Sequence, residues 1–132
     1  MLEEEQKSQF PSVALKVKID EKNYSINLDI QHCAELFYNN CTAEDIKFAS
    51  KFLHNQPLLP FTFRVSLGEN FDRIPKTYIE CLQDMAIHIE DRRRMNIMCD
   101  NIQSINTDHS PFFSAPEELS RILDNIMVFD DV

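Results

Sequence analysis

The last third of the chain alternates between strand-like and helix-like segments, and this order restricts the possible folds more than any other feature. Residues 76–82 are interpreted as a buried strand, and residues 90–98 have the pattern of a helix. A second strand is predicted over 102–106, and a helix that follows a capping box over 116–127. A strand–helix–strand–helix order implies parallel strands joined by right-handed crossovers. The sequence therefore predicts an α/β fold here.

The preceding part of the chain predicts a β-hairpin and two helices behind a polar tail. Residues 1–12 are polar and charged and are expected to form a loose tail. Apolar and polar residues alternate over 13–28 on both sides of a turn, which is the pattern of a hairpin. Helices are predicted over 30–38 and 42–53. Residues 56–75 contain two prolines near their start and no convincing helix, so we expect a long connection there.

The chain contains one glycine, Gly68, and this shortage excludes several kinds of site. A P-loop needs two glycines, a dinucleotide-binding fingerprint three, and a G-x-S-x-G nucleophile elbow two. The nearest imitation of an elbow has Ser66 at its centre and carries only the second glycine. It also lies too close to the next predicted strand to leave room for the strand and helix that an elbow requires.

Charge and cysteine spacing narrow the setting further. Twenty-two acidic against thirteen basic side chains give a formal net charge of −9, so nucleic acid is not an expected partner. No apolar run approaches about 18 residues and no secretory signal is evident, so we expect neither membrane insertion nor secretion. The four cysteines lack C-x-x-C spacing, so we expect no metal site and free thiols in a cytoplasmic protein. The only basic run, residues 92–94, is expected to form a solvated, ion-paired helix face.

Two polar loops follow the predicted parallel strands at their C-terminal ends, where open α/β sheets place ligands. The first loop contains Asp84, and the second contains Asp108, His109 and Ser110. Neighbouring strands lie less than about 5 Å apart, so Asp84 and His109 can sit side by side. In such a pair the carboxylate fixes the imidazole tautomer while the histidine acts as base and then acid. The same spacing also fits a structural hydrogen bond, and the spacing alone leaves both interpretations open.

One run of sequence is long and specific, because residues 108–119 read D-H-S-P-F-F-S-A-P-E-E-L. Together with the stretches at 74–81 and 83–87, this run strongly resembles the C-terminal third of α/β-hydrolases. The resemblance is to the plant methylesterase and hydroxynitrile-lyase-like branch and its bacterial esterase relatives. Residues 37–41 and 56–61 more loosely resemble the cap of that family and the segment after it. The implied division is a cap-like region over 13–61, a connection over 62–75 and an α/β-hydrolase segment over 76–132.

The resemblance implies hydrolysis of esters or related acyl compounds without a cofactor. Asp84 falls on the triad acid of the family and His109 on its triad base. The sequence departs from the family pattern at Met85, where a basic residue is usual, and at His88, where proline is usual. The lost proline is expected to relax the loop that holds Asp84, and His88 is expected to be an incidental surface histidine.

The nucleophile elbow of that family has no counterpart in these 132 residues. We therefore expect a truncated chain that is inactive alone and that acts on a small ester-like substrate only when a missing half completes it. Two parallel strands without neighbours expose edges and apolar faces, so we expect self-association or a complementing chain. Two alternatives stay open: a non-enzymatic interaction module, and one half of a two-chain esterase.

Overall fold

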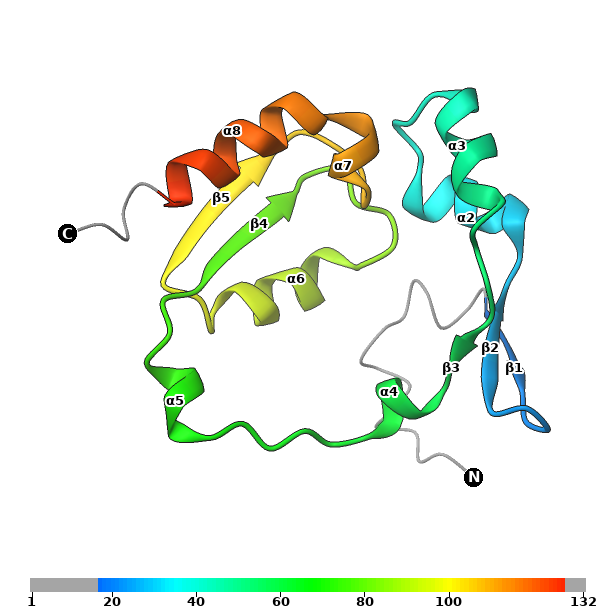
Figure 1. Cartoon of the computed structure of the whole chain (residues 1–132), viewed down its shortest axis with the longest axis horizontal. Coiled ribbons are helices and arrows are strands. Elements are labelled where there is room, and N and C mark those ends of the chain that lie inside the picture. The colour runs from blue at the N-terminus through cyan, green and yellow to red at the C-terminus, as the bar shows by residue number, and fades with distance from the viewer. Residues whose placement is uncertain (1–16, 128–132) are drawn as a thin grey trace.

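Two small β-sheets organise the residues that the computed structural model describes, which are 17–127 (Figure 1). The predicted tail over 1–12 and the start of the predicted hairpin lie outside the described residues. One sheet has three strands in the order β1-β2-β3, and the other has two strands, β4 and β5. The second sheet carries the loops on which the candidate site is built.

The predicted hairpin is confirmed within the described residues. Strand β1 (Val17–Asp20) pairs antiparallel with β2 (Ser25–Leu28). The Asp20 carboxylate stabilises the turn by accepting two hydrogen bonds from backbone N–H groups of the turn, each at 3.1 Å. A short third strand, β3 (Gln56–Pro57), pairs with β2 where the sequence predicted only a connection.

The two predicted helices follow, each with a side-chain cap. Asp29 accepts a backbone hydrogen bond at the start of α2 (Ile30–Phe37), and Thr42 forms a capping box with Asp45 at the start of α3 (Ala43–Ser50). The buried core of this region comprises Cys33, Tyr38 and Ala49, against which Phe37, Cys41, Ile46, Leu53 and Phe113 pack. Phe113 comes from the other end of the chain, so this core joins the two parts of the molecule.

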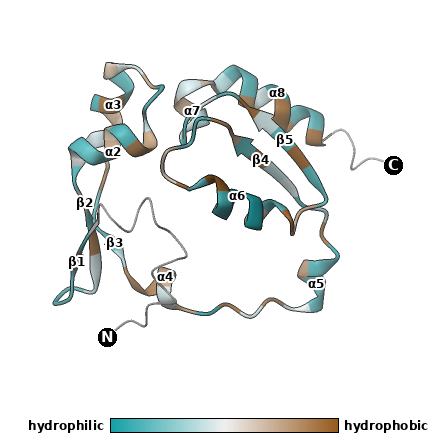
Figure 2. Ribbon diagram, turned by 180° about the vertical axis from the view of Figure 1, so that it is seen from behind, coloured by the Kyte–Doolittle hydropathy of each residue, from teal (hydrophilic) through white to brown (hydrophobic). Residues whose placement is uncertain are grey.

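The sequence predicted a connection without helix. The structure instead has two single helical turns there, α4 (Leu59–Thr62) and α5 (Glu69–Asp72). Every residue from 59 to 75 is nevertheless exposed. Figure 2 shows that hydrophobic residues recur along this stretch. The large exposed hydrophobic residues are Leu59, Phe61, Phe63, Val65, Leu67, Phe71 and Ile74.

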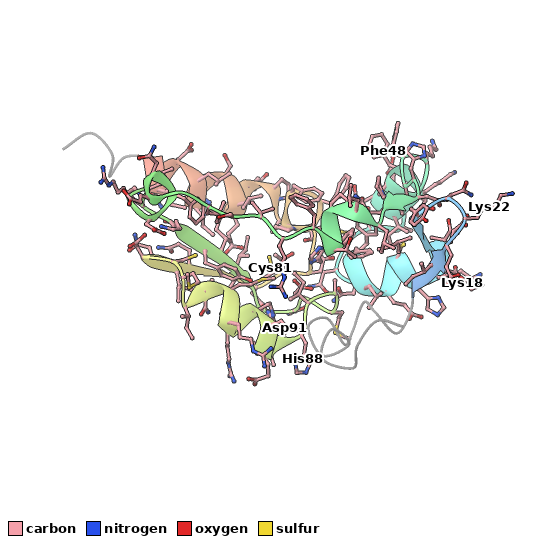
Figure 3. All side chains as sticks on the ribbon, turned by 90° about the horizontal axis from the view of Figure 1, so that it is seen from below. Lys18, Lys22, Phe48, Cys81, His88 and Asp91 are labelled. Atoms are coloured by element: carbon pink, nitrogen blue, oxygen red, sulfur yellow. The ribbon has the colours of Figure 1, made fainter. Side chains whose placement is uncertain are left out.

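The predicted strand–helix–strand–helix order is confirmed. Strands β4 (Thr77–Cys81) and β5 (Asn101–Ile105) are parallel and in register along their whole length. Helix α6 (Ile89–Asn96) connects them, and α8 (Pro116–Met127) follows β5. The two helices lie on opposite sides of the strand pair (Figures 1 and 3). The loop that was predicted to carry Asp108, His109 and Ser110 leads into a further short helix, α7 (Pro111–Ser114).

The prediction that residues 92–94 form a solvated, ion-paired helix face is wrong for Arg92. Arg93 and Arg94 are exposed and pair with acidic residues one turn earlier, at 3.0 and 3.6 Å. Arg92 instead is only 6% exposed and donates a hydrogen bond to the carbonyl of Cys81 at the end of β4. Its guanidinium therefore ties α6 to the sheet, a role that depends on the packing of the helix and not on the run of charges.

Candidate active site

The C-terminal ends of β4 and β5 bring Asp84 and His109 into contact. The pairing of the two strands continues into their loops, since the N–H of Gln83 donates to the carbonyl of Thr107 at 3.0 Å. The two following loops are therefore held together. His109 Nδ1 lies 3.0 Å from Asp84 Oδ2, within hydrogen-bond distance. The side chain of Asp84 is 6% exposed and that of His109 is 33% exposed, so the imidazole is partly accessible to solvent and the carboxylate is not.

Asp84 is held in place by its own loop. Its Oδ1 accepts hydrogen bonds from the backbone N–H groups of Ala86 at 2.7 Å and Ile87 at 3.0 Å. The next residue, His88, is exposed and caps helix α6 by accepting a hydrogen bond from the N–H of Glu90. Figure 3 labels His88 beside the start of α6, with Asp91 in its first turn. A side-chain cap thus begins this helix at the position where the resemblance leads one to expect proline.

The charge on Asp84 determines the tautomer of His109. Burial disfavours the charged form of Asp84, but the hydrogen bonds from His109, Ile87 and Ala86 outweigh it and lower the pKa of the carboxyl. Asp84 is therefore an acceptor at neutral pH, so the proton of this contact lies on Nδ1 of His109, and in the neutral imidazole Nε2 then carries the free lone pair. This arrangement is suited to general-base catalysis at Nε2.

The end of α2 and the residues that follow it contact the two strand-end loops. The ring of Phe37 lies against the imidazole of His109, with 5.1 Å between the ring centroids. Asn39 donates from its side chain to the carbonyl of Gln83 at 3.2 Å, and Asn40 donates to the side-chain oxygen of Gln83 at 2.5 Å. The cap-like part of the chain and the candidate acid–base pair are therefore in direct contact.

Asp108 is a structural centre of the site to which the sequence reasoning gave no role. Its side chain is completely buried, with 0% exposure. Oδ2 accepts from the N–H of Asn40 at 2.8 Å and from the thiol of Cys41 at 3.3 Å. Oδ1 accepts from the N–H of Ser110 at 3.0 Å and the hydroxyl of Ser114 at 2.7 Å. A signal was present in the sequence, because an ionisable residue directly precedes the candidate base.

Two cysteines and two serines near the site or singled out by the sequence are poorly suited to attack. Burial, followed by the hydrogen bond to Asp108, raises the pKa of Cys41 to about 12, and burial raises that of Cys81 to about 11. Both stay neutral thiols at physiological pH and are weak nucleophiles. Ser66 is exposed between α4 and α5, without the strand–turn–helix of an elbow, and Ser110 is buried within its loop.

Residues 17–127 offer neither a cluster of metal-binding side chains nor a membrane-spanning helix. No group of three or more His, Cys, Asp or Glu side chains there could hold a metal ion. Within the same residues, none of the helices combines the length and the apolar character that crossing a membrane would require.

Comparison with curated sequences finds relatives among plant and bacterial hydrolases. No protein-family model matches the chain. A candidate methylesterase of Arabidopsis thaliana, named methylesterase 11, chloroplastic, is 29% identical over 103 residues, or 75% of this chain and 26% of that protein. A pyrethroid hydrolase of Sphingobium wenxiniae is 27% identical over 97 residues, or 71% of this chain and 35% of that protein. The chain therefore spans only about a quarter to a third of the length of these relatives.

Comparison with solved structures identifies the fold. A methylesterase from Arabidopsis superimposes with a TM-score of 0.76 over 86% of this chain and 52% of that chain, at 18% identity. A pyrethroid hydrolase from Sphingobium faniae gives a TM-score of 0.76 over 88% of this chain and 48% of that chain, at 22% identity. The chain thus has part of an α/β-hydrolase fold, and its homologues include plant methylesterases and a bacterial pyrethroid hydrolase.

Proposed function

We propose that this chain supplies the acid–base pair of an α/β-hydrolase-type site that hydrolyses carboxylic esters. The observation that carries the proposal is the 3.0 Å contact between Asp84 Oδ2 and His109 Nδ1 at the ends of two parallel strands. Relatives that are named as methylesterases and as a pyrethroid hydrolase support the same chemistry. No cofactor enters the proposed reaction.

In the proposed reaction His109 acts through Nε2. It takes a proton from a nucleophilic hydroxyl during attack on the ester carbonyl and then gives this proton to the departing alcohol. Asp84 holds the imidazole through Nδ1 and stabilises its protonated form. Phe37 lies against one side of the ring, so the imidazole has a restricted orientation before the substrate arrives.

The nucleophile and the oxyanion donors are proposed to come from residues outside this sequence. With one glycine, the 132 residues contain no G-x-S-x-G elbow. The thiols of Cys41 and Cys81 have raised pKa values, and Ser66 lies on an exposed stretch. A base without its nucleophile lacks the covalent step, so we propose that the chain alone is inactive.

A companion segment would also cover the apolar surface that the chain exposes. Large hydrophobic residues are exposed along the connection, and Ile102 of β5 is 49% exposed. The strands β4 and β5 form a sheet of only two, and parallel sheets are normally wider and covered on both faces. We propose that this surface takes up either a complementing chain or, in its absence, a second copy of this one.

The proposal is tested by hydrolysis of p-nitrophenyl butyrate. We expect the purified chain to stay near the background rate. Adding the part of the Sphingobium pyrethroid hydrolase that lies outside the matched region, expressed separately, should raise the rate. His109→Ala should remove that gain by about 10³-fold or more, and Asp84→Asn should lower it by about 10²- to 10⁴-fold. His54→Ala, which changes an exposed histidine between α3 and β3, is the matched control.

The outcomes separate the parts of the proposal. A complemented rate that is insensitive to His109→Ala would show that the pair is not catalytic. A rate from the purified chain that His109→Ala abolishes would retain the pair and overturn inactivity of the chain alone. An immunoblot of fractionated cells tests the proposed cytoplasmic location. The same blot compares the mass of the native protein with the 15.5 kDa of this chain.

A further inference from the structure

We propose that Asp108 is a positioning residue for His109. It couples the orientation of the base to the docking of residues 37–41, which we call the cap-like segment. The inference rests on the proposed function, since it assumes that His109 is the base. Its ground is the buried carboxylate directly before His109 and the four donors that surround it.

The four donors come from two sides of the site. Ser110 and Ser114 belong to the loop and helix that follow His109, and both bind Oδ1 of Asp108. Asn40 and Cys41 belong to the loop between α2 and α3, and both bind Oδ2. Each oxygen thus serves one side, and a single carboxylate holds the loop of the base against the cap-like segment.

The cap-like segment in turn contacts the base. Phe37, at the end of α2, lies three residues before Asn40, and its ring centroid is 5.1 Å from that of His109. When Asp108 holds the N–H of Asn40 at 2.8 Å, it fixes the chain that presents Phe37. The imidazole is therefore restrained by Asp84 at Nδ1 and by Phe37 at its side. Asp108 fixes the backbone that presents Phe37 and also the loop that follows His109.

An ionised carboxylate suits this position and an amide does not. A carboxylate accepts about four hydrogen bonds through two oxygens, whereas an amide has one accepting oxygen and an NH₂ group that can only donate. Asn at position 108 could serve one pair of donors, Ser110 with Ser114 or Asn40 with Cys41, but not both. The NH₂ group would face the other pair, and buried unsatisfied donors are costly. Asp108→Asn therefore cuts the link while nearly preserving side-chain volume.

The test is NMR spectroscopy of the uniformly ¹⁵N-labelled full chain. The wild type should show His109 in a single tautomer, with the proton on Nδ1. Asp108→Asn should move the two ring nitrogen signals of His109 towards an average of the two tautomers. Exchange of the Asn40 and Cys41 amide protons should rise about tenfold or more. The matched control is Asp45→Asn, which changes a carboxylate of the neighbouring capping box and should leave the His109 signals unchanged.

The results distinguish positioning from a merely structural role. Faster amide exchange at Asn40 with unchanged His109 signals would overturn the inference, because Asp108 would then hold only the cap-like segment. If Asp108→Asn does not fold, Ser114→Ala and Cys41→Ala each remove one donor and should move the His109 signals in the same direction by less. No movement in either overturns the inference. A wild-type His109 without a fixed Nδ1–H tautomer would overturn the proposed function itself, whatever the Asp108 variants show.

Discussion

The strand-end site buries and pairs its polar side chains, whereas the connection over 59–75 exposes its apolar ones. The strand-end site, comprising Asp84, Asp108, His109 and their hydrogen-bond partners, buries two carboxylates and satisfies both with several donors. In the connection every residue is exposed, including seven large hydrophobic ones. Buried charge demands partners, and both carboxylates find their hydrogen-bond donors within the chain, whereas we propose that the cover of the exposed apolar surface lies elsewhere.

The largest expected contrast is in the cost of removing the same side chain from the two regions. Ile105, at the end of β5 beneath the strand-end site, is 0% exposed, whereas Ile74 in the connection is 57% exposed. Ile105→Ala should lower the free energy of unfolding by about 2–5 kcal/mol, and Ile74→Ala by about 0.5 kcal/mol or less. Urea unfolding followed by circular dichroism measures both. Equal losses of unfolding free energy would contradict the difference in packing between the two regions.

Limited digestion with trypsin should distinguish the exposed connection from the packed helix α6. Arg64 and Arg73 lie on the exposed connection, and the side chain of Arg92 is 6% exposed and tied to β4. Cleavage after Arg64 and Arg73 should be about tenfold faster or more than cleavage after Arg92, because local opening needs little free energy where few contacts hold the backbone. Mass spectrometry of the products identifies the sites. Early cleavage after Arg92 would contradict the tight attachment of α6.

The strand-end site should also make stability depend on pH at both extremes. The pKa values of Asp84 and Asp108 are lowered in the folded chain, so their contribution is present above the ordinary value of 3.8 and is lost as pH falls below it. The pKa of Cys41 is raised from 9.0 to about 12, so its contribution is present below pH 9.0 and is lost as pH rises towards 12. Urea midpoints measured across pH check this. Cys41→Ala should shrink the alkaline loss and leave the acid loss in place.

The smallest effect on stability is expected from making the connection polar. Phe63, Val65 and Leu67 are 67%, 72% and 58% exposed, so changing all three to Ser removes little buried surface. The free energy of unfolding should change by about 0.5 kcal/mol or less per site, while self-association falls. Sedimentation velocity of the variant and the wild type measures the association. Unchanged association would indicate that the strand pair β4 and β5, and not the connection, mediates self-association.

The sequence predicted those features that depend on local periodicity or on chain order. The hairpin alternates with period two, and the order of β4, α6, β5 and α8 determines which strand ends meet. This order was enough to predict that Asp84 and His109 lie together, and the structure brings them within 3.0 Å. Whether the pair is catalytic stays a prediction.

The features that were missed depend on packing between distant residues. The single-turn helices α4, α5 and α7 are too short to show a helical period. The burial of Arg92 depends on where α6 meets the end of β4, which no charge pattern reveals. The role of Asp108 depends on a contact with Asn40, which is 68 residues away in the chain.

That separation has a consequence for the order of folding. The partners Asp84 and His109 are 25 residues apart, and Asn40 and Asp108 are 68 apart. Loop-closure entropy favours the shorter contact by about 0.9 kcal/mol. The contact between Asp84 and His109 should therefore form before the cap-like segment docks. The hydrogen bond from Asn40 to Asp108 should form late, and it should bring Phe37 to the imidazole.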